Sequence, residues 1–513
     1  MIVPEMARRR HNTLRRLHSL ILAVVLVVAG AWVTRGPVRV FLIGDSTMAD
    51  KPIVDNPERG WGQAFPSFFD GNVIIENYAR NGRSTKSFID ERRWQTVCDQ
   101  LKTGDYVFIQ FGHNDAKITD TSRYAAPHGA YKQNLLRFIS ESRAKGAIPV
   151  LLTPVQRRKF DASGHLEDTH GDYPEVVREV ASETHAPLID LTQSSSELFN
   201  RLGPEKTKNI FLWIPDSVFD AFPSGKQDNT HFTEFGAMQI AGLVRDALMK
   251  SDLPLREHVR PFSSDSLPGL SKIVALDYFY NCEWRTVGVT RTQYHYVWED
   301  TTNSGFSEVG KVITSLGASI TKLRTAPTLS SLSRYSVYII VDPDTPAETE
   351  RPNYIGDSAA AQIAEWVKAG GVLLLMGNDK GNSEFEHLNR LSERFGIRFN
   401  EDSYHRVVGN DFKTGRFADL PDHPIFFGVK QIYMKEICSL RVEKPAVPIL
   451  TELGNVFMAS RRFGRGLVVA VGDPWLYNEY VDSGKLPPEY ENKKAGERLF
   501  TWLLQQAKAC PTR

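Results

Sequence analysis

At 513 residues, the chain is long enough for two or three domains of ordinary size. Hydrophobic residues make up 41% and charged residues 24%, which is ordinary for a globular protein. The 62 Lys and Arg residues are balanced by 61 Asp and Glu residues, which excludes a strong overall attraction to nucleic acid. We therefore predict no nucleic-acid partner.

The cysteines give no sign of a metal site. The sequence has no CxxC motif and no Cys/His cluster, so we predict no metal and no cofactor held by such ligands. So few cysteines in a chain of this length also argue against a disulfide scaffold. One or two disulfides stay open, and the sequence does not pair the four cysteines, which are Cys98, Cys282, Cys438 and Cys510.

The N-terminus has the features of a secretory signal. An apolar run at residues 20–33 ends in small residues and is preceded by five arginines: Arg8, Arg9, Arg10, Arg15 and Arg16. The run has 14 residues, whereas a membrane span needs about 20. We predict a signal peptide at residues 1–36, with an uncleaved membrane anchor at residues 20–33 as the alternative. Both interpretations make the rest of the protein secreted or periplasmic.

Residues 37–250 show an alternation of strands and helices. This alternation predicts a parallel sheet with helices on both faces, a three-layer α/β/α domain. In such sheets, ligands bind beyond the carboxyl ends of the strands. The predicted strands are 38–43, 73–77, 106–110, 148–153 and 187–191, and the predicted helices are 85–100, 131–145, 174–184 and 233–249.

A second α/β pattern covers residues 271–513. The stretch 251–270 has three prolines, several serines and no periodicity, so we predict a linker there. The second pattern predicts strands at 273–276, 337–341, 372–376 and 467–471, and helices at 307–316, 359–369, 385–395 and 495–505.

Three residues suited to acyl transfer follow three of the predicted strands. Ser46 follows the first strand, Gly82 the second and Asn114 the third. Each lies in a sequence that is ordinary for a turn or a helix N-cap. Three parallel strands would bring them to one edge of a sheet, where a hydroxyl, a bare backbone N–H and a side-chain amide could attack an ester and stabilise the resulting oxyanion.

A base and a carboxylate come just before the last helix of this region. Serine needs a base to take its proton, histidine is the usual base, and a carboxylate fixes its tautomer. Asp228 and His231 lie three residues apart on a predicted loop, a spacing that can bring them together. Taken alone, the same pair is typical of a helix cap with an exposed histidine.

The order GDS, Gly, GxND and DxxH resembles the four sequence blocks of the SGNH hydrolases, also called GDSL-type esterases. Within that superfamily, residues 37–250 are most similar to the rhamnogalacturonan acetylesterases. The resemblance implies a flavodoxin-like fold. It rests on residues 44–49, 60–62, 81–84, 104–107 and 111–115.

The resemblance also implies a function. Ser46 would be the nucleophile, with Asp228 and His231 completing a triad, and the N–H groups of Ser46 and Gly82 and the Asn114 amide would form the oxyanion hole. Such enzymes remove acetyl groups from the rhamnogalacturonan part of pectin through an acetyl-serine intermediate, without metal or organic cofactor. The alternatives are an esterase acting on another acetylated glycan or a lipid ester, and a non-catalytic glycan-binding protein.

Two residues near these blocks each have more than one interpretation. Trp61 could stack on a sugar ring or pack in the core, and Arg83 could pair with a uronate carboxylate, cap a helix or bind Asp115.

The segment 271–513 resembles a glutamine-amidotransferase-like domain, on residues 338–342, 370–377 and 472–475. The expected elbow at 377–379 has no cysteine, so we predict a non-catalytic domain. Its aromatic-rich stretch either stacks on sugars or packs in the core, and contains Trp284, Tyr294, His295, Tyr296 and Trp298.

Overall fold

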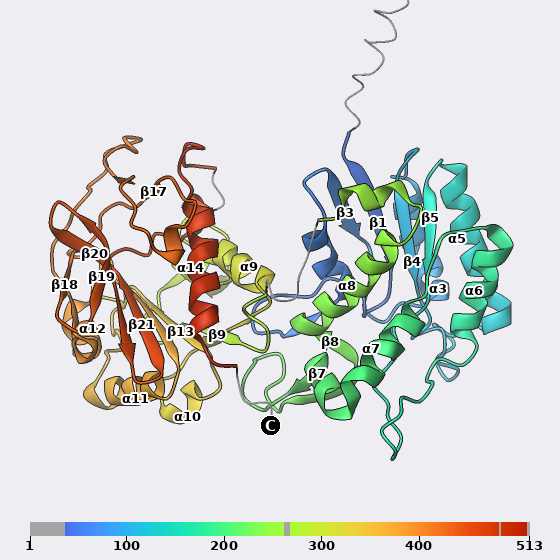
Figure 1. The fold of residues 1–513 in the computed structure, drawn as a ribbon, viewed down its shortest axis with the longest axis horizontal. Helices are drawn as coiled ribbons and strands as arrows, with labels where there is room; N and C mark the ends of the chain where they lie inside the picture. The colour runs from blue at the N-terminus through green and yellow to red at the C-terminus, as the bar shows by residue number, and fades with distance from the viewer. Residues whose placement is uncertain (1–35, 261–266, 482–483, 510–513) are drawn as a thin grey trace, which may run out of the picture.

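The computed structural model describes residues 36–260, 267–481 and 484–509. Two α/β units lie side by side, each around its own sheet (Figure 1). The predicted signal peptide or anchor lies almost entirely outside the described residues. Among the described residues, no helix is both long enough and apolar enough to cross a bilayer.

The first unit is built on a parallel five-stranded sheet in the order β3-β1-β4-β5-β6, as the sequence predicts. The register pairs Leu42 with Asn77 and Gly44 with Gln110, so three neighbouring strands end at the same edge. Each strand lies within a residue or two of its predicted position: β1 (Val38–Gly44), β3 (Val73–Asn77), β4 (Tyr106–Gln110), β5 (Ile148–Leu152) and β6 (Leu188–Ile189).

Helices cover both faces of this sheet and form a separate apolar core on each. One core contains residues of α2 (Trp61–Ala64), α7 (Leu191–Lys206) and α8 (Glu234–Met249). The other contains residues of α3 (Thr85–Asp90), α4 (Arg93–Cys98), α5 (Lys132–Ala144) and α6 (Tyr173–Thr184). The domain is therefore a three-layer α/β/α sandwich.

A small antiparallel sheet lies beside the parallel one. Its order is β2-β8-β7, from β2 (Glu58–Arg59), β8 (Lys226–Thr233) and β7 (Phe211–Ile214). The prediction of a plain loop around Asp228 and His231 is wrong, because both residues belong to β8. Pairing of β8 with β7 and β2 holds this segment in place through backbone hydrogen bonds.

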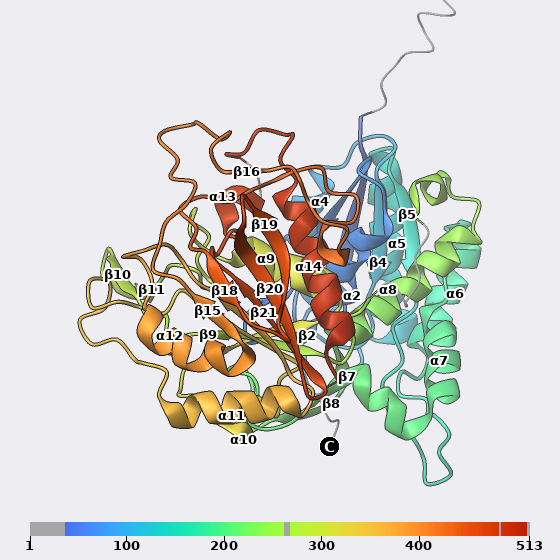
Figure 2. The ribbon, with the colours of Figure 1, turned by 60° about the vertical axis from the view of Figure 1, so that its left-hand side comes forward.

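The second unit has a mixed sheet in the order β12-β9-β13-β14-β21-β20-β18-β15. Figure 2 shows this sheet with β9, β15, β18, β19, β20 and β21 labelled. The first five strands are parallel, and they include the four predicted strands. They are β12 (Ser319–Leu323), β9 (Ile273–Asp277), β13 (Val337–Val341), β14 (Val372–Met376) and β21 (Gly466–Val471). Antiparallel strands then extend the sheet: β20 (Asn455–Phe463), β18 (Leu440–Val442), β15 (Ile397–Phe399), and β19 (Val447–Glu452), which pairs with β20.

This second sheet also has a core on each face. One face packs against α9 (Ser307–Ser315), α13 (Asn478–Val481) and α14 (Asn492–Gln506). The other packs against α10 (Leu329–Leu332), α11 (Asp357–Lys368) and α12 (Phe385–Ser392). Within the predicted linker, residues Pro254–His258 form a short 3-10 helix.

The two units are joined by a segment that follows the Ser46 block. Val54 makes a parallel bridge to Ile320 of β12, so the first unit adds one residue to the edge of the second sheet. Asp55 is buried, and its Oδ1 accepts hydrogen bonds from Thr321 Oγ1 (2.7 Å) and the Lys322 N–H (3.2 Å). Lys322 Nζ lies 2.6 Å from Asp55 Oδ2, which makes a nearly buried ion pair across the junction.

Replacing Lys322 with methionine is expected to destabilise this junction by roughly 3–5 kcal/mol, because it leaves the Asp55 carboxylate buried without its cation. Thermal unfolding of the full chain measures the effect as a lower midpoint. The double variant Asp55→Leu/Lys322→Met should recover part of the loss, since it removes the buried Asp55 carboxylate but leaves the partly exposed Glu299, which lies 2.6 Å from Lys322 Nζ, without its cation. Equal midpoints for wild type and Lys322→Met would contradict the assignment.

Candidate active site

The site forms where the sheet order changes direction. From β1, the chain first adds β3 on one side and then β4, β5 and β6 on the other, so the crevice beyond β1 is a topological switch point. Ser46 lies two residues past β1, Gly82 lies beyond β3 and Asn114 beyond β4. The structure thus brings all three predicted residues to one edge of the sheet.

Ser46, His231 and Asp228 form a continuous hydrogen-bonded chain. Ser46 Oγ lies 2.9 Å from His231 Nε2, and His231 Nδ1 lies 2.9 Å from Asp228 Oδ2. Asp228 Oδ1 accepts hydrogen bonds from the N–H groups of Thr230 (2.7 Å) and His231 (3.0 Å). The sequence separates the serine from the histidine by 185 residues, and the structure joins them directly.

The environment of Asp228 keeps it ionised. Partial burial raises its pKa, but the hydrogen bond and charge of His231 and the two backbone N–H donors outweigh burial and hold the pKa well below its usual range. A carboxylate in this position fixes the His231 tautomer with the proton on Nδ1, which leaves Nε2 free to accept the Ser46 proton.

Asp45 belongs to a separate pair that the sequence analysis did not identify. Its Oδ2 lies 3.0 Å from His113 Nδ1, while His113 Nε2 lies 3.0 Å from the Val155 carbonyl oxygen. Asp45 Oδ1 accepts hydrogen bonds from the Thr47 N–H (2.9 Å) and Oγ1 (2.8 Å). Burial raises the Asp45 pKa, but His113 and Thr47 together bring it below its usual value. This pair fixes the turn that presents Ser46.

Residues 60–62 pack against the same turn and hydrogen-bond to it. The Trp61 N–H donates to the Thr47 carbonyl at 2.9 Å, and its indole Nε1 donates to Gln110 Oε1 at 2.6 Å. A Cβ at Gly60 would lie 2.2 Å from the Ala49 carbonyl oxygen, so only glycine allows this approach. The Trp61 indole is fully buried, and the interpretation of Trp61 as a sugar-stacking residue is wrong.

Three possible oxyanion donors lie past the ends of neighbouring strands, at the same sheet edge as Ser46. Within the described part of the chain, no acceptor faces the N–H of Ser46 or of Gly82. Gly82 has a φ of +74°, a conformation that favours glycine. Asn114 Nδ2 donates one hydrogen to the Arg83 carbonyl at 3.1 Å, which fixes the amide and leaves its second hydrogen for a ligand.

Asp115, in the GxND block, is hydrogen-bonded to Thr85, which lies shortly after Gly82. Its Oδ1 accepts from the Thr85 N–H (2.9 Å) and Oγ1 (2.5 Å) at the start of α3, while its buried Oδ2 has no partner among the described residues. Burial, together with the nearby Asp45, raises the Asp115 pKa to about 7 despite the Thr85 hydrogen bonds. At neutral pH this carboxyl is therefore partly protonated.

The raised pKa predicts that stability falls as pH rises from about 4 to about 7, because the folded protein keeps a proton that the unfolded chain releases. Each unit of pKa shift corresponds to about 1.4 kcal/mol. The Asp115→Asn variant keeps the acceptor for Thr85 and should show a flatter dependence of unfolding midpoint on pH. Parallel pH profiles for the two proteins would contradict this assignment.

The Arg83 side chain is held by its own domain. Its Nε lies 3.1 Å from both carboxylate oxygens of Glu91, and its Nη1 donates to the Asn81 carbonyl at 2.8 Å. Asp115 bonds Thr85 instead of Arg83. A different cation lies beside the oxyanion donors: a Cβ on Gly82 would be 3.6 Å from the Arg123 guanidinium. No sequence signal pointed to Arg123.

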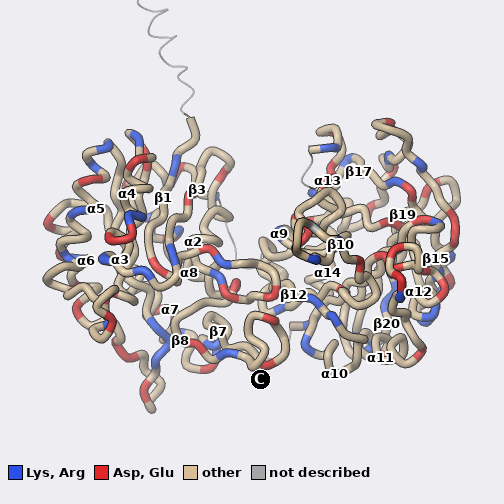
Figure 3. The backbone as a smooth tube through the Cα atoms, turned by 180° about the vertical axis from the view of Figure 1, so that it is seen from behind, with Lys and Arg blue, Asp and Glu red and all other residues tan. Residues whose placement is uncertain are grey.

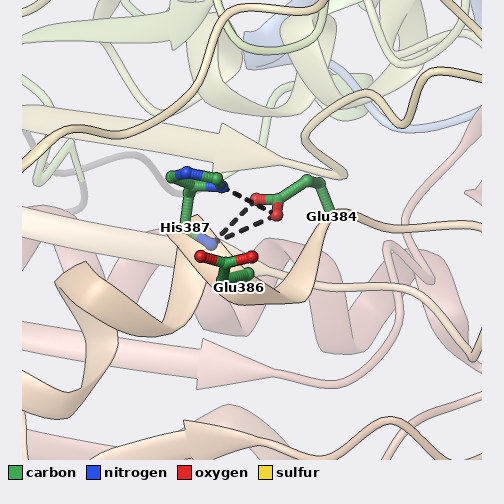
Figure 4. A group of neighbouring side chains, drawn as sticks. All are labelled: Glu384, Glu386 and His387. Atoms are coloured by element: carbon green, nitrogen blue, oxygen red, sulfur yellow. Dashed lines mark hydrogen bonds and ion pairs between the residues drawn. The ribbon is translucent and has the colours of Figure 1, made fainter.

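One group of neighbouring side chains in the described residues has ligands close enough for a metal ion: Glu384, Glu386 and His387 (Figure 4). Glu384 accepts from the His387 N–H at 3.0 Å and lies 2.9 Å from its Nδ1, so it caps the N-terminus of α12. The capping role explains Glu384 and His387, while Glu386 pairs with Arg390 at 2.7 Å. The cluster lies far along the chain from Ser46.

A buried cysteine lies beside the expected amidotransferase elbow of the second unit. A Cβ on Gly377 would lie 3.5 Å from Cys438 Sγ, and the thiol donates to the Gly472 carbonyl. Burial raises the pKa of this thiol well above its usual value, so it stays protonated and unreactive. Tyr296 and Trp298 are buried as core residues, while Trp284 is largely exposed.

The site on the first sheet has the chemistry of a serine hydrolase. The serine hydroxyl is hydrogen-bonded to a histidine base, and the histidine is hydrogen-bonded to a carboxylate. Residues 42–237 match the GDSL-like Lipase/Acylhydrolase family.

The curated relatives that are similar to this chain include three rhamnogalacturonan acetylesterases, one of them named as probable. Rhamnogalacturonan acetylesterase RhgT of Bacillus subtilis is 42% identical over 44% of this chain and 94% of its own length. Probable rhamnogalacturonan acetylesterase YesY of the same organism is 36% identical over 43% of this chain and 96% of its own length. Rhamnogalacturonan acetylesterase of Emericella nidulans is 43% identical over 42% of this chain and 87% of its own length.

The chain therefore belongs to the GDSL-like acylhydrolases, carboxylic ester hydrolases, and its N-terminal half is related to rhamnogalacturonan acetylesterases. The match to the family ends at residue 237, before the second sheet begins.

Proposed function

We propose that this protein is a serine esterase that removes O-acetyl groups from pectic polysaccharide. The observation that carries the proposal is the chain from Ser46 Oγ through His231 to Asp228, at 2.9 Å per link. We assign the oxyanion hole to the N–H groups of Ser46 and Gly82 and the amide of Asn114, which lie past the ends of the neighbouring strands β1, β3 and β4.

The reaction follows from these positions. Ser46 Oγ attacks the acetyl carbonyl while His231 Nε2 accepts its proton, and the oxyanion is stabilised by the three donors. His231 then gives the proton to the departing sugar hydroxyl, leaving acetyl-Ser46. Water, deprotonated by His231, attacks this intermediate and releases acetate. Asp228 stabilises the imidazolium that forms in both halves.

Positive charge near the site supports an acidic substrate. Arg123 lies beside Gly82 and pairs with Asp120 at 3.1 Å. Partial burial and the charges of Arg123 and Arg157 lower the pKa of the neighbouring Lys117, and they outweigh the opposing charges of Asp120 and Asp45. Such a group of cations suits the carboxylate of a uronic acid next to the acetylated sugar. The names of the relatives agree with a pectic substrate.

The test is a comparison of acetate release from acetylated pectin and from acetylated xylan, with p-nitrophenyl acetate as a general ester substrate. We expect hydrolysis of all esters that reach Ser46, with the highest kcat/KM on pectin. Hydrolysis of p-nitrophenyl acetate with xylan preferred over pectin would keep the esterase and overturn the substrate. No hydrolysis of any ester would overturn the function.

The remaining parts of the proposal concern location and the second domain. The basic, apolar and small-residue pattern of residues 1–36 supports a secreted or periplasmic enzyme, in agreement with an extracellular polymer as substrate.

The second domain is proposed to be a non-catalytic, amidotransferase-like unit. Its elbow lacks a cysteine, and the nearby Cys438 thiol is protonated and buried, which supports this assignment.

A further inference from the structure

A cleft of about 710 Å³ lies at the junction of the two domains. Its N-terminal wall comes from the end of α7, from β7 and from the start of α8, and its C-terminal wall comes from the start of β9, the turn before β12 and the end of α10. The volume is in the range of ligand sites, which occur preferentially at domain interfaces.

The charged side chains of this cleft are mainly positive. Four cations, Lys206, Lys208, Lys272 and Arg334, face two carboxylates, Glu205 and Asp216. Lys208 Nζ lies 2.7 Å from Glu205 Oε2, so this cation and this carboxylate form a pair. Lys272 Nζ donates to the Pro268 and Leu504 carbonyls, and Arg334 Nη1 donates to the Ser217 carbonyl, while both keep their positive charge. The cations come from both domains, on segments that flank the junction near β7, β8 and β12 (Figure 3).

Hydroxyl groups and a ring complete the lining. Ser319, Ser330 and Ser333 line the wall from the C-terminal domain. Trp213 lines the opposite wall, and Arg158 and Lys208 lie over its ring at 4.7 and 4.8 Å. Side-chain hydroxyls both donate and accept hydrogen bonds, as sugar hydroxyls do. Cations with hydroxyls and an aromatic ring suit a sugar chain that carries carboxylates, and suit a neutral or cationic chain less well.

The cleft adjoins the hairpin that carries the proposed base and acid. Thr233, which lines the cleft, lies two residues beyond His231 on β8. Trp213 lies on the paired strand β7, and its indole Nε1 donates to Asn229 Oδ1 at 3.0 Å, next to Asp228. A polymer bound in this cleft therefore lies against the same hairpin as the reacting ester.

We propose that the interdomain cleft is a binding site for an anionic oligosaccharide segment, one that carries uronate carboxylates. The proposal rests on the proposed function for its substrate class, and it gives the second domain a part in holding the polymer. The ester-bearing sugar is placed at Ser46, and a neighbouring acidic stretch of the chain is placed in the cleft.

Binding of a fully de-esterified oligogalacturonate to the full chain, measured by calorimetry, tests the proposal. This probe has no ester, so the result does not depend on catalysis. We expect binding that weakens with added salt, and no comparable binding of a neutral xylo-oligosaccharide. Lys206→Glu/Lys208→Glu should weaken binding at least tenfold and leave hydrolysis of p-nitrophenyl acetate unchanged.

Two further variants make the result specific to the cleft. Lys145→Glu/Lys250→Glu changes the total charge equally on exposed positions outside the cleft and should leave binding intact. Ser333→Trp fills the cleft from the second domain without a charge change and should also weaken binding. Undiminished binding in both cleft variants, equal losses in the Lys145/Lys250 control, or no binding by wild type would each overturn the proposal. A wild type that binds the probe but releases no acetate from pectin would overturn only the proposed function.

Discussion

Replacing Ser46 with alanine is expected to reduce acetate release from acetylated pectin about 10⁴-fold or more, because the acetyl-enzyme can no longer form. The alanine removes one hydroxyl that lies 2.9 Å from His231 Nε2 and leaves the Asp45–His113 pair and the Trp61 contacts of the turn in place. The loss should appear in kcat, and p-nitrophenyl acetate should show it as well as pectin.

The control for this variant is Ser140→Ala, which removes an exposed hydroxyl of α5 that bonds only its own helix. Both variants should unfold at the wild-type temperature, and Ser140→Ala should have wild-type activity. Near-wild-type activity of folded Ser46→Ala would show that another group attacks the ester, and the proposed mechanism would be wrong.

The parallel sheet of the first domain was predictable because its strands are short, apolar and bounded by turn residues. The prediction extends to the edge at which Ser46, Gly82 and Asn114 meet, since parallel strands end on the same side. The sequence does not predict the distances between these three residues. The adjacency of β3, β1 and β4 depends on strand order, which no local pattern encodes.

The sequence did not predict the elements that lack a strong periodic pattern of apolar residues. The predicted helix at 85–100 is two helices, because Arg92 has a φ of +58° and breaks the run. Helix α7 (Leu191–Lys206) was not predicted, and the predicted strand 187–191 overlaps it only at Leu191. Strand β8 has mostly polar residues, since its role is to carry Asp228 and His231 rather than to form a core.

The antiparallel half of the second sheet was also missed. Its strands β15, β18 and β20 alternate less clearly than the buried parallel strands, and partner strands far apart in the chain define them. Long-range pairs in the site share this difficulty. The contact between Asp45 and His113 joins residues 68 positions apart, and each lies in a motif whose ordinary interpretation is a turn.

The junction between the domains involves two segments that lead away from the site. Residues 51–59 follow the Ser46 block, and Lys51 Nζ bonds Glu58 and Asn81, next to Gly82. The turn before β8 contributes the Val218 carbonyl, which accepts from Thr321 Oγ1 at 3.1 Å. Both segments thus contact β12 of the second domain.

Replacing Asp228 with asparagine is expected to lower kcat about 10⁴-fold, although the two side chains have the same shape. The amide oxygen of the new side chain can still accept the N–H groups of Thr230 and His231, so β8 keeps its backbone geometry. The amide nitrogen donates where the carboxylate accepted. His231 must then carry its proton on Nε2, facing Ser46, and cannot accept the serine proton.

Steady-state kinetics on acetylated pectin separates this effect from a loss of structure. We expect kcat to fall with little change in KM, because the carboxylate stabilises the imidazolium of the transition state and does not touch the sugar. Asp246→Asn makes the same carboxylate-to-amide change at an exposed residue of α8 and should keep wild-type kcat. A loss confined to KM would place Asp228 in substrate binding, since the tautomer of His231 affects only proton transfer.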